Sequence, residues 1–265
     1  MKDIQSLFIA VSLLICLQSC EKTEPDPINV ISIEQDFEVY PKQEIGADGQ
    51  QFFLVVKATE ESACDNSYID AQMDLNEGHI VVKINGVVDP EPCMSGSAIP
   101  EILFALPPED MSYTIEFQKD EFVSTSGVLN IGEGRIELDI ENLGGIFVSE
   151  NTLNLIQENW VWGYFYQDPE SVSGNEYNLE EIKEEFLSVI PETMDIEEGD
   201  YDYFSIEADG TVNIPDTKDS YGRFAYETEL DDYWKAVTEA LIPIMEQRPA
   251  LKYVITSGKG DLIEN

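Results

Sequence analysis

The sequence predicts a β-sandwich followed by an α+β domain, and three observations support this fold class. Between Ile28 and Asn142, short apolar runs alternate with turn signals, and no convincing helical pattern occurs. After Gly145, two segments carry apolar residues at helical spacing, with short strand patterns around them. The chain is 43% hydrophobic, so each predicted part can build a core of its own.

The amino-terminal domain, residues 28–142, is expected to be a β-sandwich. Tyr113–Phe117 and Ile136–Ile140 alternate apolar and polar residues, which predicts strands with one face in water. Asp48-Gly49 and Asn85-Gly86 are hairpin signals. The predicted strands are Val30–Tyr40, Gln51–Ala58, Ile80–Val88, Glu101–Leu106, Tyr113–Gln118, Phe122–Ile131 and Arg135–Glu141.

This strand pattern resembles the immunoglobulin-like modules that are common in exported bacterial proteins. The resemblance covers less than half of the chain and implies two packed antiparallel sheets. It assigns no functional residue.

Two cysteines remain in the predicted folded part, Cys64 and Cys93. Cys64 lies in the acidic segment 59–78 and Cys93 in the Pro- and Gly-containing segment 90–100, and both segments are predicted to be loops. In an oxidising compartment, one disulfide between them is the economical interpretation. It would stabilise the fold by about 3 to 4 kcal/mol in the chain-entropy model. We expect it to staple two loops near one end of the sandwich.

Residues 143–150, with Gly144-Gly145, are predicted to link the sandwich to an α+β domain over residues 151–265. Asn178 is an N-cap candidate for a helix that ends before Pro191. A second helix is expected from Glu229 to Met245, with its last turn kinked or ended by Pro243. The strands expected around them are Trp160–Tyr166, Tyr203–Ala208, Thr211–Ile214, Gly222–Tyr226 and Lys252–Thr256.

The first residues are built like a signal peptide, which we expect to comprise residues 1–19. Lys2 precedes an apolar run from Leu7 to Leu17, which is much shorter than the roughly 20 residues that a membrane-spanning helix needs. The run ends at Ser19-Cys20, after which the sequence turns acidic and contains prolines. Residues 20–27 are therefore predicted to be a disordered tether.

Leu17-Gln18-Ser19-Cys20 resembles the lipobox of bacterial lipoproteins, although Gln18 stands where a small residue is usual. The resemblance implies cleavage before Cys20 and attachment of fatty acids such as palmitate to this cysteine, which becomes the membrane anchor. With the acidic tether, it also resembles surface or periplasmic lipoproteins of the Bacteroidota. The implied location is the cell envelope, at the outer membrane, facing either the surface or the periplasm.

Composition excludes one class of partner. The chain has 54 Asp and Glu residues against 14 Lys and Arg, a formal net charge of −40, and the acids are spread over both halves. Affinity for nucleic acids comes from basic residues that neutralise phosphates, so nucleic-acid binding is excluded. The acidity is explained by solubility outside the cell, with capture of cations or basic ligands as the alternative.

An aromatic row is the main candidate for ligand binding. Trp160, Trp162, Tyr164 and Tyr166 occupy alternate positions, so a strand places all four rings on one face, where they could stack on a glycan. Val161 and Phe165 make the other face apolar as well, which favours the alternative of a central strand packed on both sides.

Catalytic and metal-site signals are weak. The single histidine, His79, opens a predicted strand and has no nucleophile motif near it, and no metal-ligand spacing or cofactor loop occurs. The sequence favours a non-enzymatic lipoprotein that binds a glycan or protein, mediates adhesion or has a structural role. The alternatives are a carbohydrate-active or other carboxylate-dependent hydrolase outside the cell and a subunit of a surface assembly.

Overall fold

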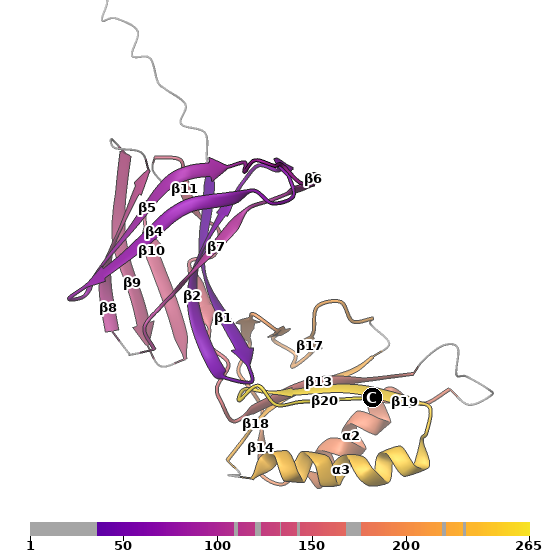
Figure 1. Ribbon diagram of the computed structural model, residues 1–265. Coiled ribbons are helices and arrows are strands. Elements are labelled where there is room, and N and C mark those ends of the chain that lie inside the picture. Colours follow the sequence, from indigo (N-terminus) through magenta and orange to yellow (C-terminus); the bar gives the residue numbers. More distant parts are fainter. Residues whose placement is uncertain are drawn as a thin grey trace, which may run out of the picture. The chain divides into compact units, whose positions relative to one another are not determined.

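The fold is built mainly from β-sheets, as Figure 1 shows for the computed structural model of the chain. Strands make up 55% and helices 12% of it. The prediction of a mostly β protein with several sheets is confirmed. The expected signal peptide, Cys20 and tether lie outside the described residues. The structure describes residues 36–108, 111–119, 123–132, 134–141, 144–167, 176–218, 221–229 and 232–265.

The first sheet has four strands in the order β11-β1-β2-β7. β1 and β2 form a hairpin over the Asp48-Gly49 turn, where Gly49 has a φ of +94° that favours glycine. β11 lies inside the segment predicted to be a linker and pairs in parallel with β1. The strands are β1 (Phe37–Gly46), β2 (Gly49–Ala58), β7 (Glu101–Ala105) and β11 (Ile146–Val148).

The second sheet has nine strands in the order β17-β16-β15-β12-β10-β9-β8-β5-β4. Its apolar residues share one core with those of β1 and β2, which makes the two sheets the layers of a sandwich. The strands are β4 (Tyr68–Asn76), β5 (His79–Val88), β8 (Met111–Lys119), β9 (Val123–Gly132), β10 (Arg135–Ile140), β12 (Thr152–Asn154), β15 (Gly199–Tyr201), β16 (Phe204–Ile206) and β17 (Val212–Asn213).

Two local predictions in the sandwich are wrong. Asn85-Gly86 does not close a hairpin. It lies inside β5, where Gly86 has a φ of +129° opposite a register shift between Asp70 and Ala71, so the pair forms a bulge. The segment 59–78 is not a loop either, because Ile69, Ala71 and Met73 alternate with polar residues and form β4. A short pair, β3 (Ser62–Cys64) and β6 (Ser95–Ala98), joins the two cysteine segments.

The remaining sheet has five strands in the order β14-β18-β13-β19-β20, and two helices cover one face of it (Figure 1). Val161 and Phe165 of β13 pack into the core beneath these helices. The elements are β13 (Trp160–Gln167), α2 (Leu179–Val189), β14 (Thr193–Met194), β18 (Gly222–Thr228), α3 (Tyr233–Gln247), β19 (Leu251–Ser257) and β20 (Leu262–Glu264).

The first of these helices begins as the sequence predicts and the second ends differently. The side chain of Asn178 accepts a hydrogen bond from the Glu181 amide and so caps α2. Pro243 lies inside α3, which continues to Gln247, because the apolar face that carries Leu241 and Ile244 stays packed in the core.

The carboxy-terminal half also contributes to the sandwich. β12 pairs with β10, and β15 pairs in parallel with β12, so β15, β16 and β17 extend the nine-stranded sheet. The side chain of Gln43 on β1 donates to the carbonyl of Ile156 and accepts from its amide, both within the buried interior. The division of the chain into a sandwich domain over residues 28–142 and an α+β domain over residues 151–265 stays a prediction.

Candidate functional site

β13 carries the predicted aromatic row on the face of its sheet that is opposite the helices. Gly163 lies between Trp162 and Tyr164 and belongs to the helix-facing side of the strand, with Val161 and Phe165. A methyl group there would lie 2.3 Å from the carbonyl oxygen of Val254, so only glycine allows β19 to pair this closely. The strand therefore combines a close approach to β19 at Gly163 with four aromatic rings on its other face.

The first two rings are buried in a core. Trp160 is 8% exposed and Trp162 4% exposed, and both contact the ring of Phe204 on β16. Tyr201 meets Trp160 edge-on at 5.1 Å between ring centroids, and Tyr203 lies 5.6 Å from Trp162. Trp160 and Trp162 thus offer no surface to a ligand, which agrees with the packing interpretation of this part of the row.

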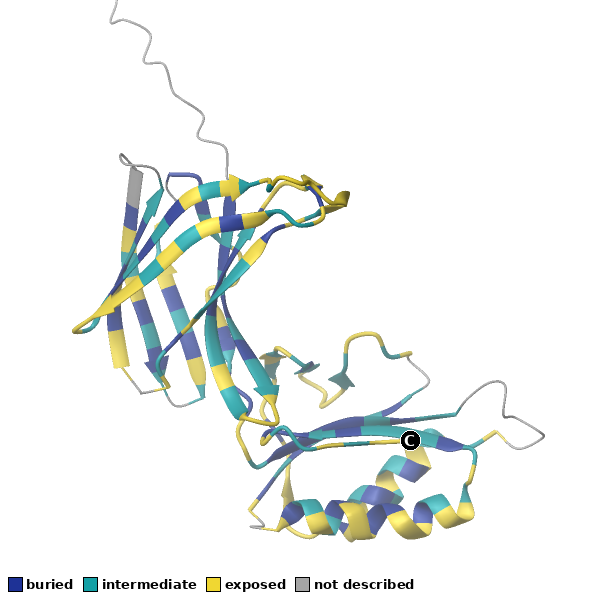
Figure 2. Cartoon of the chain, viewed as in Figure 1, coloured by how far each residue is buried: buried dark blue, intermediate teal, exposed yellow. Residues whose placement is uncertain are grey.

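The last two rings lie beyond Tyr201, Tyr203 and Phe204, the three rings that cover the tryptophans. Tyr164 and Tyr166 are half-buried, and their ring centroids are 5.9 Å apart. Tyr221, just before β18, stacks on both of them, at 5.4 Å from Tyr164 and 5.2 Å from Tyr166. We call these three rings the tyrosine cluster. Figure 2 shows the change from buried to intermediate residues along β13.

The hydroxyl of Tyr164 holds its proton more tightly than an ordinary tyrosine hydroxyl, because its pKa is raised. Burial raises the pKa of Tyr164 above its ordinary value, and the neighbouring hydroxyls of Tyr166 and Tyr221 and the carboxylate of Glu264 raise it further. A protonated phenol can donate one hydrogen bond and accept others. The cluster therefore offers ring surface together with hydroxyl donors.

Strand register places two basic residues beside the cluster. Arg223 on β18 is opposite Tyr164, and Lys252 on β19 is opposite Tyr166, so both share the face of the rings. On the β18 side a cavity of about 460 Å³ adjoins Tyr221. Its lining comes from α2, the residue after β14, the turn between β16 and β17, and β18, and includes the polar side chains of Glu180, Lys183, Asp195, Asp209, Thr211 and Arg223.

The sequence named Tyr164 and Tyr166 as ligand-binding candidates but did not indicate Tyr221, Arg223 or Lys252. Arg223 and Lys252 each lie in a strand that the sequence predicts, Gly222–Tyr226 and Lys252–Thr256. Which residue of β18 or β19 faces which residue of β13 is a matter of register, and the sequence alone does not define it.

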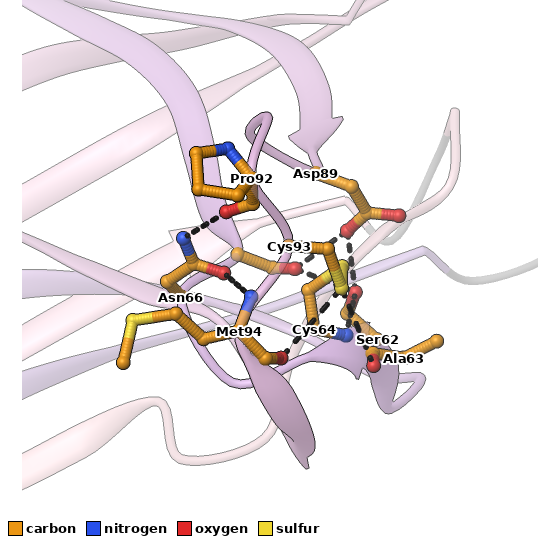
Figure 3. The surroundings of a disulfide bond; sticks show 9 residues. Ser62, Ala63, Cys64, Asn66, Asp89, Pro92, Cys93 and Met94 are labelled. Carbon is orange, nitrogen blue, oxygen red and sulfur yellow. Dashed lines mark hydrogen bonds between the residues drawn. A yellow bond between two sulfur atoms is a disulfide. The ribbon is translucent and has the colours of Figure 1, made fainter.

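The predicted disulfide is confirmed: the sulfurs of Cys64 and Cys93 are 2.08 Å apart, and the bond joins β3 to the segment before β6 (Figure 3). Asp89 accepts hydrogen bonds from Ser62 and Ser67, which lower the pKa of its carboxyl. Asn66 donates to the carbonyl of Pro92 and accepts from the Met94 amide. These hydrogen bonds and the disulfide together join the two cysteine segments.

Within the described residues, no three His, Cys, Asp or Glu side chains are placed to hold a metal ion. No helix in that part of the chain is long and apolar enough to cross a membrane. Comparisons with protein-family models, curated proteins and solved structures find no match for this chain.

Proposed function

We propose that this chain is an exported bacterial lipoprotein, anchored in the envelope through Cys20, and that it acts as a binding component outside the cytoplasm. The observation that carries the proposal is the disulfide between Cys64 and Cys93. Structural disulfides persist in oxidising compartments and are rare in the cytosol. A disulfide downstream of a lipobox-like Leu17-Gln18-Ser19-Cys20 is what an exported, lipid-anchored protein would contain.

We propose further that the sandwich is an immunoglobulin-like module and that the five-stranded sheet with its helices forms an α+β domain. The antiparallel series β8, β9 and β10 and the shared core of both sheets support the first assignment. The packing of α2 and α3 on one face of an antiparallel sheet supports the second. The sandwich would then act as a spacer or adhesion module for the binding face.

Metabolic labelling with a clickable fatty acid tests the anchor. In cells that express the protein, the wild type and the control Cys16→Ala should carry the label, because Cys16 belongs to the segment that is removed. Cys20→Ala should lose the label, because the acyl-accepting sulfur is gone. Retention of the label by Cys20→Ala would show that the anchor is elsewhere. Protease treatment of intact cells then distinguishes the surface, where the protein is cleaved, from the periplasm, where it is protected.

A second candidate function is favoured by the cavity beside the tyrosine cluster. Glu180, Asp195 and Asp209 all line it, and carboxylate-dependent glycoside hydrolysis uses two carboxyl groups about 5 to 10 Å apart. Release of new reducing ends from a bound oligosaccharide would identify a hydrolase instead of a binding protein.

A further inference from the structure

The open part of the five-stranded sheet has a defined layout around the tyrosine cluster. Viewed across the strands, Tyr166 of β13 lies in a row between Tyr221, just before β18, and Lys252 of β19. Across the next row, Tyr164 lies between Arg223 and Val254, with Glu264 of β20 beyond Val254. Apolar ring surface and two cations therefore occupy the same small area of the molecule.

Basic side chains elsewhere in the described chain already have partners. Each of the following forms an ion pair with a carboxylate: Lys42, Lys57, Lys83, Lys119, Arg135, Lys183, Lys235 and Arg248. Lys259 lies over the ring of Tyr233, 5.4 Å from its centroid. In a chain with 54 acidic residues, most basic side chains are expected to form ion pairs with carboxylates.

The described bases without such a partner are Lys218, Arg223 and Lys252, and all three border the tyrosine cluster. Arg223 and Lys252 flank its rings in the sheet. The carbonyl of Lys218 accepts a hydrogen bond from the Tyr221 amide, and the Lys218 side chain is exposed. A cationic group that has no carboxylate partner on so acidic a protein can pair with an anion from outside.

The surroundings select the kind of anion. Glu264 lies on the same face, and Glu180, Asp195 and Asp209 line the adjoining cavity, so a polymer with closely spaced charges would be repelled. Carboxylates accept hydrogen bonds from hydroxyl groups, and tyrosine rings provide an apolar surface with polar tips. A ligand with a few negative charges, many hydroxyls and an apolar ring face satisfies these groups together.

We propose that the tyrosine cluster, Arg223, Lys252 and the adjoining cavity form a binding site for an acidic saccharide. In this arrangement the carboxylate or sulfate of the sugar pairs with Arg223 and Lys252, since a guanidinium can bind such a group through two hydrogen bonds. The sugar ring packs on the tyrosine cluster, and its hydroxyls donate to the carboxylates of the cavity. This inference deepens the binding role proposed above and does not depend on the lipid anchor.

Calorimetric titration of the purified full-length protein in detergent tests the site. The probes are an oligosaccharide with a single uronate, the same oligosaccharide with a single sulfate in place of the uronate, its neutral counterpart, and an oligoglutamate of similar length. We expect one or both acidic saccharides to bind at least about tenfold more tightly than the neutral one and the oligoglutamate. Preference between the uronate and the sulfated probe identifies the anionic group.

Three variants connect this binding to the site. Arg223→Gln should weaken binding of the acidic saccharide by about tenfold or more, because a charge-assisted hydrogen-bond pair is lost. Tyr221→Ala should also weaken it, because the ring surface is lost. Lys235→Gln, which removes the same charge from an exposed position on α3, should leave affinity unchanged.

Several outcomes would overturn the proposal. One is that neither acidic saccharide binds at millimolar concentration although the circular dichroism of the protein is that of a folded chain. Equal affinity for the neutral probe would remove the role of the bases. Equal affinity for oligoglutamate that Tyr221→Ala does not change would indicate a site for acidic peptides. A protein that lacks the lipid label but shows the expected binding would leave this inference intact and contradict only the proposed anchor.

Discussion

The two ends of β13 have the same alternation of aromatic residues, yet they have different surroundings. Trp160 and Trp162 lie under the rings of β15 and β16 and form a core. Tyr164 and Tyr166 lie beyond that cover, against Tyr221, with bases on either side. An alternating aromatic pattern therefore defines a face of a strand, whereas a distant part of the chain decides whether that face is core or surface.

The largest expected difference between the two ends is in stability. Trp162→Ala should lower the free energy of unfolding by about 3 to 5 kcal/mol, because it removes a buried indole and leaves a cavity. Tyr166→Ala should cost well under half of that, since Tyr166 is only half-buried. Urea denaturation of both variants measures the difference. Equal losses would mean that the two ends are packed alike, which would remove the basis for a binding site at Tyr166.

The fold was predictable wherever a local pattern decides the structure. Alternation identified β8 and β10, and the polar cap at Asn178 identified the start of α2. The cover of Trp162 was not predictable, because it depends on the pairing of β15 with β12, two short strands that are far apart in sequence. The same holds for the site: Tyr164 follows from a pattern, whereas its contact with Tyr221 follows from register.

A second expected effect concerns Gly163, which lies in β13 between the buried Trp162 and the half-buried Tyr164. Gly163→Ala should lower the free energy of unfolding by about 1 to 3 kcal/mol, because the new methyl group would collide with backbone atoms of β19. Gly46→Ala is the matched control, since a Cβ at Gly46 meets nothing within 4 Å. Urea denaturation compares the two variants. If both lose the same free energy, the close approach of β13 and β19 is not what requires glycine.

The smallest expected effect concerns Asp202, which holds the cover of the tryptophans to β1. Its carboxylate accepts a hydrogen bond of 2.5 Å from the backbone amide of Gln43. The hydroxyl of the neighbouring Tyr203 accepts one from the backbone amide of Ile45. Partial burial, which removes water from the carboxylate, raises the pKa of Asp202, and Glu150 and Glu44 raise it further, although the hydrogen bond from the Gln43 backbone amide opposes this. A carboxyl that binds its proton more tightly in the folded state makes the fold less stable as pH rises from the pKa of the unfolded state through that of the folded state.

The sign of this linkage can be tested with Asp202→Asn, which keeps a side-chain oxygen as the acceptor for Gln43 and cannot ionise. At pH 7 the variant should be more stable than the wild type, by no more than about 1 kcal/mol, because solvent screens a partly exposed charge. The advantage should disappear as pH falls below the ordinary pKa of an aspartic acid, about 3.9, where the wild-type carboxyl is protonated in both states. Urea denaturation over this pH range measures the difference. An advantage that grows toward low pH would mean that the ionised carboxylate stabilises the cover, and that Asp202 binds β1 through its charge.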